Sequence, residues 1–198
     1  MPRVIDLPLE PLSGRAFEPF GEIIGVRDGP PVFTGPHIKS WGMSFESEGG
    51  VELMHACYIH QPMEFTCLES HLNVTQCFIP LGYHPSVMVV APADAQSGDR
   101  RPPGPESVRA FLVPGDRGIL LWRRTWHALT RFPVRSAGAE FALLTSVETQ
   151  RELERERRGG TPPRVTHVVD YADEMGVAFK VVDAQDLISG VSARDAPS

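Results

Sequence analysis

The chain has few cysteines. Only three occur in 198 residues, Cys57, Cys67 and Cys77, and they lie roughly ten residues apart. An odd number without a Cys-x-x-Cys pair argues against a disulfide scaffold and against a zinc knuckle. We therefore expect three small side chains that pack on neighbouring strands.

The chain also lacks an excess of basic residues and long apolar runs. Its 19 Lys and Arg against 25 Asp and Glu give a net charge of -6, which argues against a general nucleic-acid binder. No apolar run approaches the ~18 residues needed to span a bilayer. The first residues, "MPRVIDLPLEPL", are broken by prolines and acids, unlike a secretory signal. We therefore expect a cytoplasmic protein with no nucleic-acid and no membrane partner.

Glycine and proline, in contrast, are abundant. The 18 Gly and 19 Pro divide the chain into short segments. Between them lie β-branched, aromatic and apolar runs such as "TQCFIPLG", "PSVMVVAPA" and "EFALLTSV". Short strands at regular spacing are typical of an all-β sandwich or barrel. The length suits one sizeable domain with its own core.

The pattern changes after residue 147. The segment "ETQRELERERRGG" combines strong helix formers, mixed charge and a Gly-Gly stop, which predicts a solvated helix over Glu148–Arg158. The following "TPPRVTHVVDYADEMGVAFKVVD" predicts one or two more strands. We therefore expect a barrel over residues 1–147 and a C-terminal extension over 148–198, packed on the same domain.

Two segments carry histidines together with other polar side chains. In "LESHLNVTQCFIPLG", Glu69 and His71 are two residues apart, so on a strand they share one face. Gln76 follows after a turn and can rejoin them from the next strand. About fifty residues later, "PGDRGILLWRRTWHAL" places His127 at the start of a returning strand. One hairpin folded against the other inside a barrel would bring all four side chains together.

This spacing resembles the two cupin motifs. Glu69-x-His71 stands where the first motif has its histidine pair, Gln76 stands for its glutamate, Gly82 for its glycine, and "PGDRG" with His127 resembles the second motif. The resemblance implies a double-stranded β-helix, or jelly-roll barrel, with a few short helices. It also implies a divalent metal, namely nickel, manganese, iron or zinc, on these four side chains. The same four residues also fit a metal-free site that binds a substrate.

A closer resemblance is to the ureidoglycolate lyase family, and it covers roughly residues 4–147. The segments that carry it are "LPLEPLSGRAFEPFGEII", "LESHLNVTQCFIPLG", "MVVAPA", "VRAFLVPGDRGILLWRRTWHAL" and "EFALLTSV". The resemblance implies an enzyme that splits ureidoglycolate into glyoxylate and urea, within allantoin degradation in purine catabolism. It implies no organic cofactor.

The implied reaction breaks the C–N bond of a carbinolamide. The hydroxyl must lose a proton while the urea nitrogen gains one, so an acid–base group is required. A metal chelated by the hydroxyl and the carboxylate would lower the hydroxyl pKa. Glu69, if it is not a metal ligand, is our first candidate for the proton transfer, and His127 is the second.

A small carboxylate substrate also needs a cationic anchor. Arg123 and Arg124 flank the second motif, and since they alternate, one of them is expected to point inward. Arg109 on the preceding strand is a further candidate for substrate binding. His55 and His60 lie five residues apart on one strand and face opposite ways, so at most one lines the pocket, and we take His60.

Two other functions fit the same residues. One is a different cupin enzyme, an isomerase or a dioxygenase acting on a small carboxylic acid. The other is a non-catalytic cupin that binds a small ligand. A homodimer is expected in each case, because cupins often pair or exchange N-terminal strands.

Overall fold

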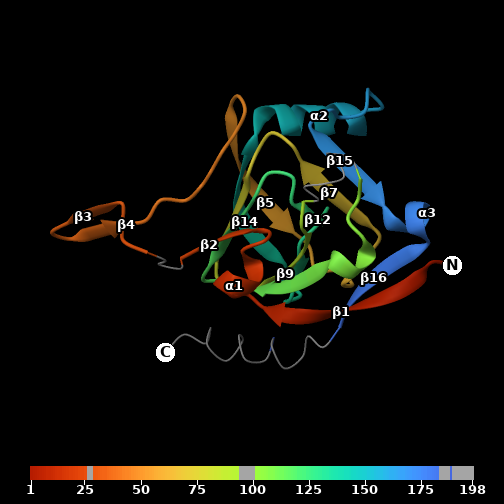
Figure 1. Ribbon diagram of the computed structural model, residues 1–198, viewed down its shortest axis with the longest axis horizontal. Coiled ribbons are helices and arrows are strands. Elements are labelled where there is room, and N and C mark those ends of the chain that lie inside the picture. The colour runs from red at the N-terminus through yellow and green to blue at the C-terminus, as the bar shows by residue number, and fades with distance from the viewer. Residues whose placement is uncertain (26–28, 94–100, 183–187, 189–198) are drawn as a thin grey trace.

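The computed structural model describes residues 1–25, 29–93, 101–182 and 188 (Figure 1). Most of the strands belong to two large sheets. The first sheet runs in the order β15 (Thr166–Asp170), β7 (Cys67–His71), β12 (Trp126–Ala128), β9 (Ser86–Ala91), β10 (Arg109–Val113), β1 (Arg3–Pro11), β16 (Val177–Val182) and β6 (Glu64–Phe65), with β13 (Phe132–Pro133) paired to β9. The second runs in the order β2 (Gly21–Ile24), β11 (Gly118–Leu121), β8 (Gln76–Leu81), β14 (Ala139–Ser146) and β5 (Val51–Tyr58).

The remaining elements are short. A hairpin of β3 (Phe33–Gly35) and β4 (Ile38–Ser40) projects from the body in Figure 1. The helices are α1 (Gly14–Phe17), a 3₁₀ turn at Pro105–Ser107, α2 (Val147–Arg157) and α3 (Tyr171–Met175). Among the described residues, none of these helices has the length and apolar character that a membrane span requires.

Strand β9 shows how the sheets form a barrel. Its six residues are all buried, although their side chains alternate between two faces. Val87 and Val89 pack with β1, β16 and α3 residues in one apolar cluster, on the outer side of the sheet. Met88 and Val90 pack with residues of the second sheet in the other cluster, inside the barrel. The first sheet therefore curls, so that side chains of β1 and β16 pack with those on the outer side of β9. Such a curled sheet is expected for an all-β, cupin-like barrel.

The alternation also determines which polar side chains enter the barrel. On β7, Leu68 joins the outer cluster, so its neighbour Glu69 points inward, and His71 follows on the same face. On β12, Trp126 and Ala128 join the outer cluster, so His127 points inward. Strands β7 and β12 are antiparallel neighbours, and His127 lies directly opposite Glu69.

Residues after 147 continue the same structure. Helix α2 begins at Val147, one residue before the predicted start. Ser146 caps it, because its hydroxyl accepts a hydrogen bond from Thr149 N at 3.0 Å. Strand β15 then pairs with β7, and β16 pairs in parallel with β1. Two strands of the extension are therefore built into the first sheet. Within the extension, residues 183–187 and 189–198 lie outside the described residues.

Candidate active site

A cavity of about 650 Å³ opens inside the barrel, between the two sheets. Its walls come from β5, β7, β8, β12 and β14, and helix α2 contributes four more side chains. The polar groups on it include Glu69, His71, Gln76, His127 and Arg131. All four side chains that the sequence predicts to converge therefore line one cavity.

Glu69, His71 and His127 form its central cluster. The Glu69 Oε1 atom lies 3.8 Å from His71 Nε2 and 3.8 Å from His127 Nδ1, and the two imidazole centroids are 5.2 Å apart. The two histidine side chains are 3% and 2% exposed, whereas Glu69 is 15% exposed. The carboxylate is thus the member of the cluster that is most open to a ligand.

Hydrogen bonds orient both imidazole rings. His127 Nδ1 lies 3.0 Å from the Ala128 carbonyl oxygen, which can only accept, so Nδ1 carries the proton and Nε2 has a free lone pair. His71 Nδ1 lies 2.9 Å from Thr166 Oγ1 on β15. Among the described residues, neither Nε2 has a hydrogen-bond partner although both are buried. Fixing one ring nitrogen in this way is how proteins present the other nitrogen to a metal or a substrate.

Burial shifts the pKa of each of the three groups in the direction that favours its uncharged form. The pKa of His71 falls to about 3, first because the ring is buried and then because Arg131 is close. The pKa of His127 also falls well below its usual value, for the same two reasons and through His71. Burial raises the pKa of Glu69 to about 7, although Arg131 opposes this. Near neutral pH the cavity thus holds two neutral imidazoles and a carboxyl close to its midpoint.

Gln76 completes the polar floor from β8. Its amide nitrogen donates to Thr145 Oγ1 at 3.4 Å, whereas its amide oxygen is buried and has no partner among the described residues. An unpaired buried acceptor is costly unless an ion or a ligand donor occupies the space beside it.

Arg131 is a buried cation at this cavity, and no pattern in the sequence indicated it. Its side chain is 2% exposed, with Nη1 donating to the Ala128 carbonyl at 3.0 Å, and its guanidinium carbon lies 3.9 Å from the centre of the Phe78 ring. No carboxylate among the described residues forms an ion pair with it, and its Nε is buried without a partner. Burial accordingly lowers the pKa of Arg131.

Helix α2 lies where a solvated helix was predicted, but one of its faces forms part of the cavity wall. Its side chains at this wall are Gln150, Leu153, Glu156 and Arg157. Their spacing of three and four residues places them on one face of the helix. Two of these four side chains are charged, which is why the segment gave no clear sign of a buried face.

The donor set of the central cluster fits a divalent metal. Glu69, His71 and His127 each offer one ligand atom, and these atoms lie within 4.8 Å of one another. Two neutral imidazoles and a carboxylate suit nickel, manganese, iron or zinc, with Gln76 available as a further oxygen ligand. The two unpartnered Nε2 atoms and the unpartnered amide oxygen are what such a site presents before an ion binds.

Comparison with known proteins identifies the family of the chain. The family model for ureidoglycolate lyase matches residues 4–160. The chain belongs to the ureidoglycolate lyase family. It is 35% identical over 130 residues to a protein named ureidoglycolate lyase from Azotobacter vinelandii, covering 61% of this chain and 74% of that one. It is 32% identical over 129 residues to one of the same name from Brucella melitensis, covering 61% and 72%.

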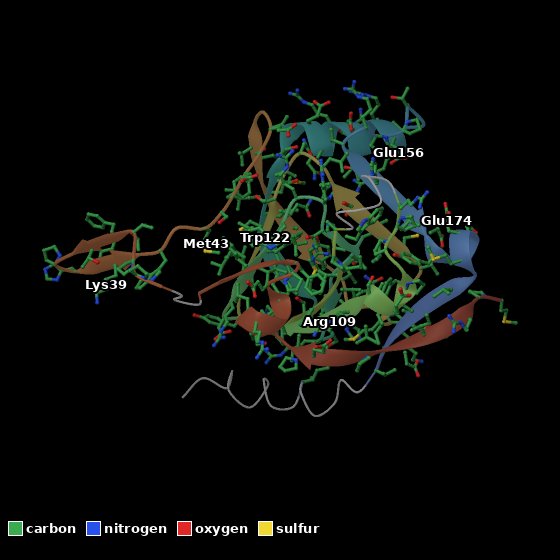
Figure 2. All side chains as sticks on the ribbon, in the orientation of Figure 1. Lys39, Met43, Arg109, Trp122, Glu156 and Glu174 are labelled. Carbon is green, nitrogen blue, oxygen red and sulfur yellow. The ribbon has the colours of Figure 1, made fainter. Side chains whose placement is uncertain are left out.

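Four further residues predicted to bind substrate lie away from the cavity of this ureidoglycolate lyase family member. Arg109 pairs with Glu10 and donates to the Ala16 carbonyl, and Figure 2 places it beside α1 and β1, far from Glu156 on α2. Arg123 pairs with Glu48 and donates to the Leu72 carbonyl. The other two, Arg124 and His60, are exposed, and neither lines the cavity.

Local backbone explains these differences. Arg123 and Arg124 occupy the tight turn between β11 and β12, where Arg124 has a φ of 69°, so strand alternation does not apply to them. His60 follows the end of β5, and its Nδ1 lies 2.9 Å from the Pro133 carbonyl, to which it donates. Arg131, and none of these four residues, lines the cavity.

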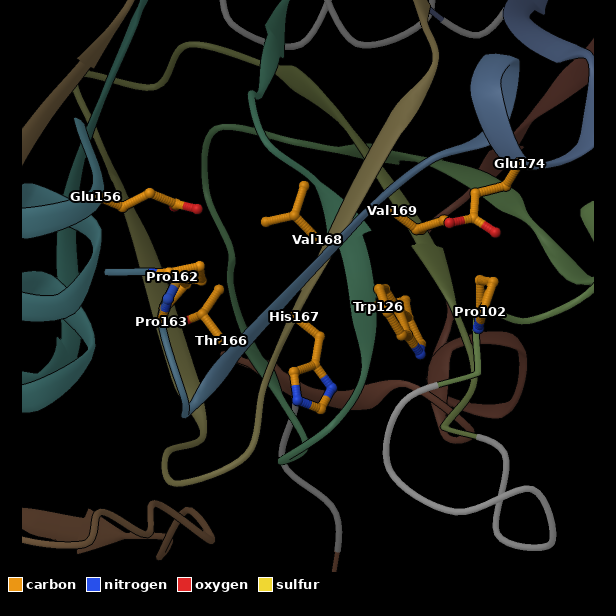
Figure 3. Close-up of a pocket in the computed structure, with 10 residues that line it drawn as sticks. All are labelled: Pro102, Trp126, Glu156, Pro162, Pro163, Thr166, His167, Val168, Val169 and Glu174. Carbon is orange, nitrogen blue, oxygen red and sulfur yellow. The ribbon is translucent and has the colours of Figure 1, made fainter. Parts of the chain in front are cut away.

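A second cavity of about 320 Å³ lies against β15 (Figure 3). Trp126 and His167 line it, while Glu156 and Glu174 stand on opposite sides of it in the close-up. It contains none of the residues expected to act on a substrate. The residues expected to act on a substrate line the larger cavity instead.

The buried histidines predict how the stability of metal-free protein depends on pH. In the unfolded chain a histidine binds a proton below about pH 6.5, whereas the pKa of His71 in the folded protein is about 3, and that of His127 is also lowered. Acidification from pH 6.5 toward pH 3 therefore favours unfolding. Glu69 acts in the opposite direction. The pKa of Glu69 is about 7 in the folded protein and 4.5 in the unfolded chain. Its contribution to the stability of the fold is therefore complete below pH 4.5 and is lost as the pH rises through 7.

The destabilising effect of the two histidines on acidification outweighs the stabilising effect of the one glutamate. The net stability therefore falls as the pH is lowered. We expect the urea midpoint, measured with a chelator present, to fall between pH 7 and pH 5 by more in the parent than in His71→Gln. The comparison between the two proteins cancels the titration of every other group. Equal falls in both would contradict the buried, neutral state of His71.

Proposed function

We propose that the protein is a ureidoglycolate lyase and that the reaction takes place in the cavity of Glu69, His71, His127 and Arg131. Membership of the family identifies the chain as a lyase. The observation that supports this site is the set of buried polar atoms without partners: His71 Nε2, His127 Nε2, Gln76 Oε1 and Arg131 Nε. All four belong to side chains that line one cavity. A hydroxy acid and an ion would supply the missing partners.

Arg131 is the proposed anchor of the substrate carboxylate. Guanidinium binds carboxylate through two parallel N–H···O bonds, and such charge-assisted bonds strengthen where water is excluded. The Phe78 ring under the guanidinium restricts its orientation. The substrate would thus enter as an anion, which offsets the cost of the buried unpaired cation.

Glu69 is the proposed acid–base group. The carbinol hydroxyl must release a proton, and the departing urea nitrogen must receive one, while the C–N bond breaks and a C=O bond forms. A carboxyl whose pKa is near 7 can accept and return that proton at neutral pH. Its partial exposure supports this role, because a substrate in the cavity could contact it.

The proposed metal ligands are His71 and His127, with Gln76 as a further donor, and Glu69 is a ligand only if it is not the acid–base group. A divalent ion bound there would polarise the hydroxyl oxygen and lower its pKa. The low pKa values of both histidines keep them unprotonated, so protons do not compete with the ion for these ligands. Thr166 and the Ala128 carbonyl hold the two rings in place.

The direct test is product release by purified protein. The metal content is first measured after purification without added metal. Urea and glyoxylate are then assayed with ureidoglycolate and with nickel, manganese, iron or zinc supplied in turn. We expect the two products in equal amounts, and no turnover by the His71→Gln/His127→Gln double variant. Metal-loaded parent that releases neither product would contradict the proposal.

A homodimer and a role in allantoin degradation are also part of the proposal. The β3–β4 hairpin supports the dimer, since it projects from the barrel in Figure 1 and carries exposed apolar side chains. They are Val32, Phe33 and Ile38. Exposed apolar side chains that gather on one projecting segment are typical of an interaction surface.

A further inference from the structure

Three potential metal ligands meet on the outer face of the second sheet, away from the central cluster. On β5, His55 and Cys57 share the face that points to solvent. On β14, Glu140 lies directly opposite Cys57 in the strand register. All three side chains are exposed, and each comes from a strand held by a continuous hydrogen-bonded ladder.

Their ligand atoms already converge. His55 Nε2 lies 3.0 Å from Glu140 Oε2, and Cys57 Sγ lies 3.7 Å from His55 Nε2. All three atoms lie within 4.8 Å of one another. Zinc–ligand bonds of about 2.0–2.3 Å in tetrahedral geometry require neighbouring ligand atoms ~3.3–3.7 Å apart. Small side-chain rotations would therefore suffice to enclose an ion.

We propose that Cys57, His55 and Glu140 bind a zinc ion on the outside of the barrel, with water in the fourth position. Thiolate, imidazole and carboxylate are the three ligand types that zinc takes in proteins, and the thiolate disfavours magnesium and calcium. The site does not depend on the proposed reaction. The ion would link the edge strand β5 to β14, and the β5 residues Met54, Ala56 and Tyr58 line the cavity together with Cys57 itself. Binding outside would thus stiffen one wall of the cavity inside.

Cobalt distinguishes this site from the central cluster, because a cobalt–thiolate bond gives charge-transfer absorption in the near ultraviolet. The central cluster of Glu69, His71 and His127 offers no sulfur ligand. The probe is Co²⁺ added under reducing conditions to full-length His71→Gln/His127→Gln, in which the central histidines are absent. We expect the thiolate band to appear, and Zn²⁺ to abolish it by displacement.

Variants in this background assign the ligands. Cys57→Ser should abolish the band, whereas the matched control Cys67→Ser should retain it, since Cys67 lies by Asp170 on another sheet. Since even outer-shell partners are worth about 10- to 100-fold in metal affinity, His55→Ala and Glu140→Gln should each weaken Co²⁺ binding by at least about tenfold.

Three results would overturn the site. One is the absence of a thiolate band at excess cobalt, and the second is a band that survives Cys57→Ser. The third is unchanged affinity in both His55→Ala and Glu140→Gln, which would show that the cysteine binds cobalt alone. Circular dichroism confirms that each variant is folded, and the exposure of all three positions favours this.

Discussion

Replacing Glu69 with glutamine is expected to lower kcat for glyoxylate release by about 10²- to 10⁴-fold, the usual contribution of a general acid–base group. Glutamine has nearly the same shape but neither accepts nor returns a proton. The carboxyl pKa of about 7, caused by burial, is what suits Glu69 to both steps. The rate is measured at saturating ureidoglycolate and at neutral pH.

The metal content of the same variant separates the two expectations for Glu69. If the carboxylate acts in proton transfer, Glu69→Gln retains its ion while kcat falls. If it acts only as a ligand, the ion and the activity disappear together. Glu156→Gln is the matched control, because this carboxylate belongs to α2 at the wall of the same cavity. A Glu69→Gln protein with the kcat of the parent would exclude both functions.

Replacing Arg131 with methionine is expected to lower kcat/KM by about 10²- to 10³-fold, the range for losing one partner of a buried charge pair. The loss follows because the substrate carboxylate would be buried without a cation. Arg131→Lys should recover only part of the loss, since an ammonium retains the charge but not the planar pair of donors. Initial rates across a range of ureidoglycolate concentrations give both values.

The stability of Arg131→Met is the second readout. Arg131 is a buried cation whose Nε has no partner, so an apolar side chain of similar volume should leave the free energy of unfolding unchanged or increase it. Arg123→Met is the matched control, because Arg123 pairs with Glu48 outside the cavity. If Arg123→Met lost as much activity as Arg131→Met, the substrate anchor would have been assigned to the wrong arginine.

The period of a β-strand explains why much of the cavity could be predicted. Residues two apart on a strand share a face, so Glu69 and His71 had to point the same way. The turn residues around "PGDRG" fixed where the chain reverses before His127. Leu68 on β7 and Trp126 on β12 pack in the apolar cluster on the outer side of the sheet. The residues that alternate with them on each strand therefore point into the barrel. Local pattern and core composition together specify this part of the site.

The cation could not be predicted in the same way. Arg131 follows β12, just before the two-residue strand β13, and so short a segment has no readable period. Arg124 lies closer to His127 in sequence and Arg123 lies equally far from it, but both occupy a turn, where strand alternation does not apply. Distance along the chain is a poor guide where a turn intervenes.

The helix and the last strands show a different limit. The positions Gln150, Leu153 and Arg157 repeat at helical spacing and could have indicated a buried face, but a single apolar residue among charges gives a weak signal. Thr166 orients His71 from β15, far along the chain. Such a contact depends on which strands pair, and strand pairing is a property of the whole fold.

A crystal structure of the protein with glyoxylate tests the proposed site most directly. Glyoxylate carries the carboxylate and the carbonyl carbon that the reaction leaves behind. We predict its carboxylate within hydrogen-bonding distance of the Arg131 guanidinium, and its carbonyl oxygen facing Glu69, His71 and His127. Glyoxylate bound with full occupancy elsewhere, and a cavity that holds neither product nor ion, would contradict the prediction.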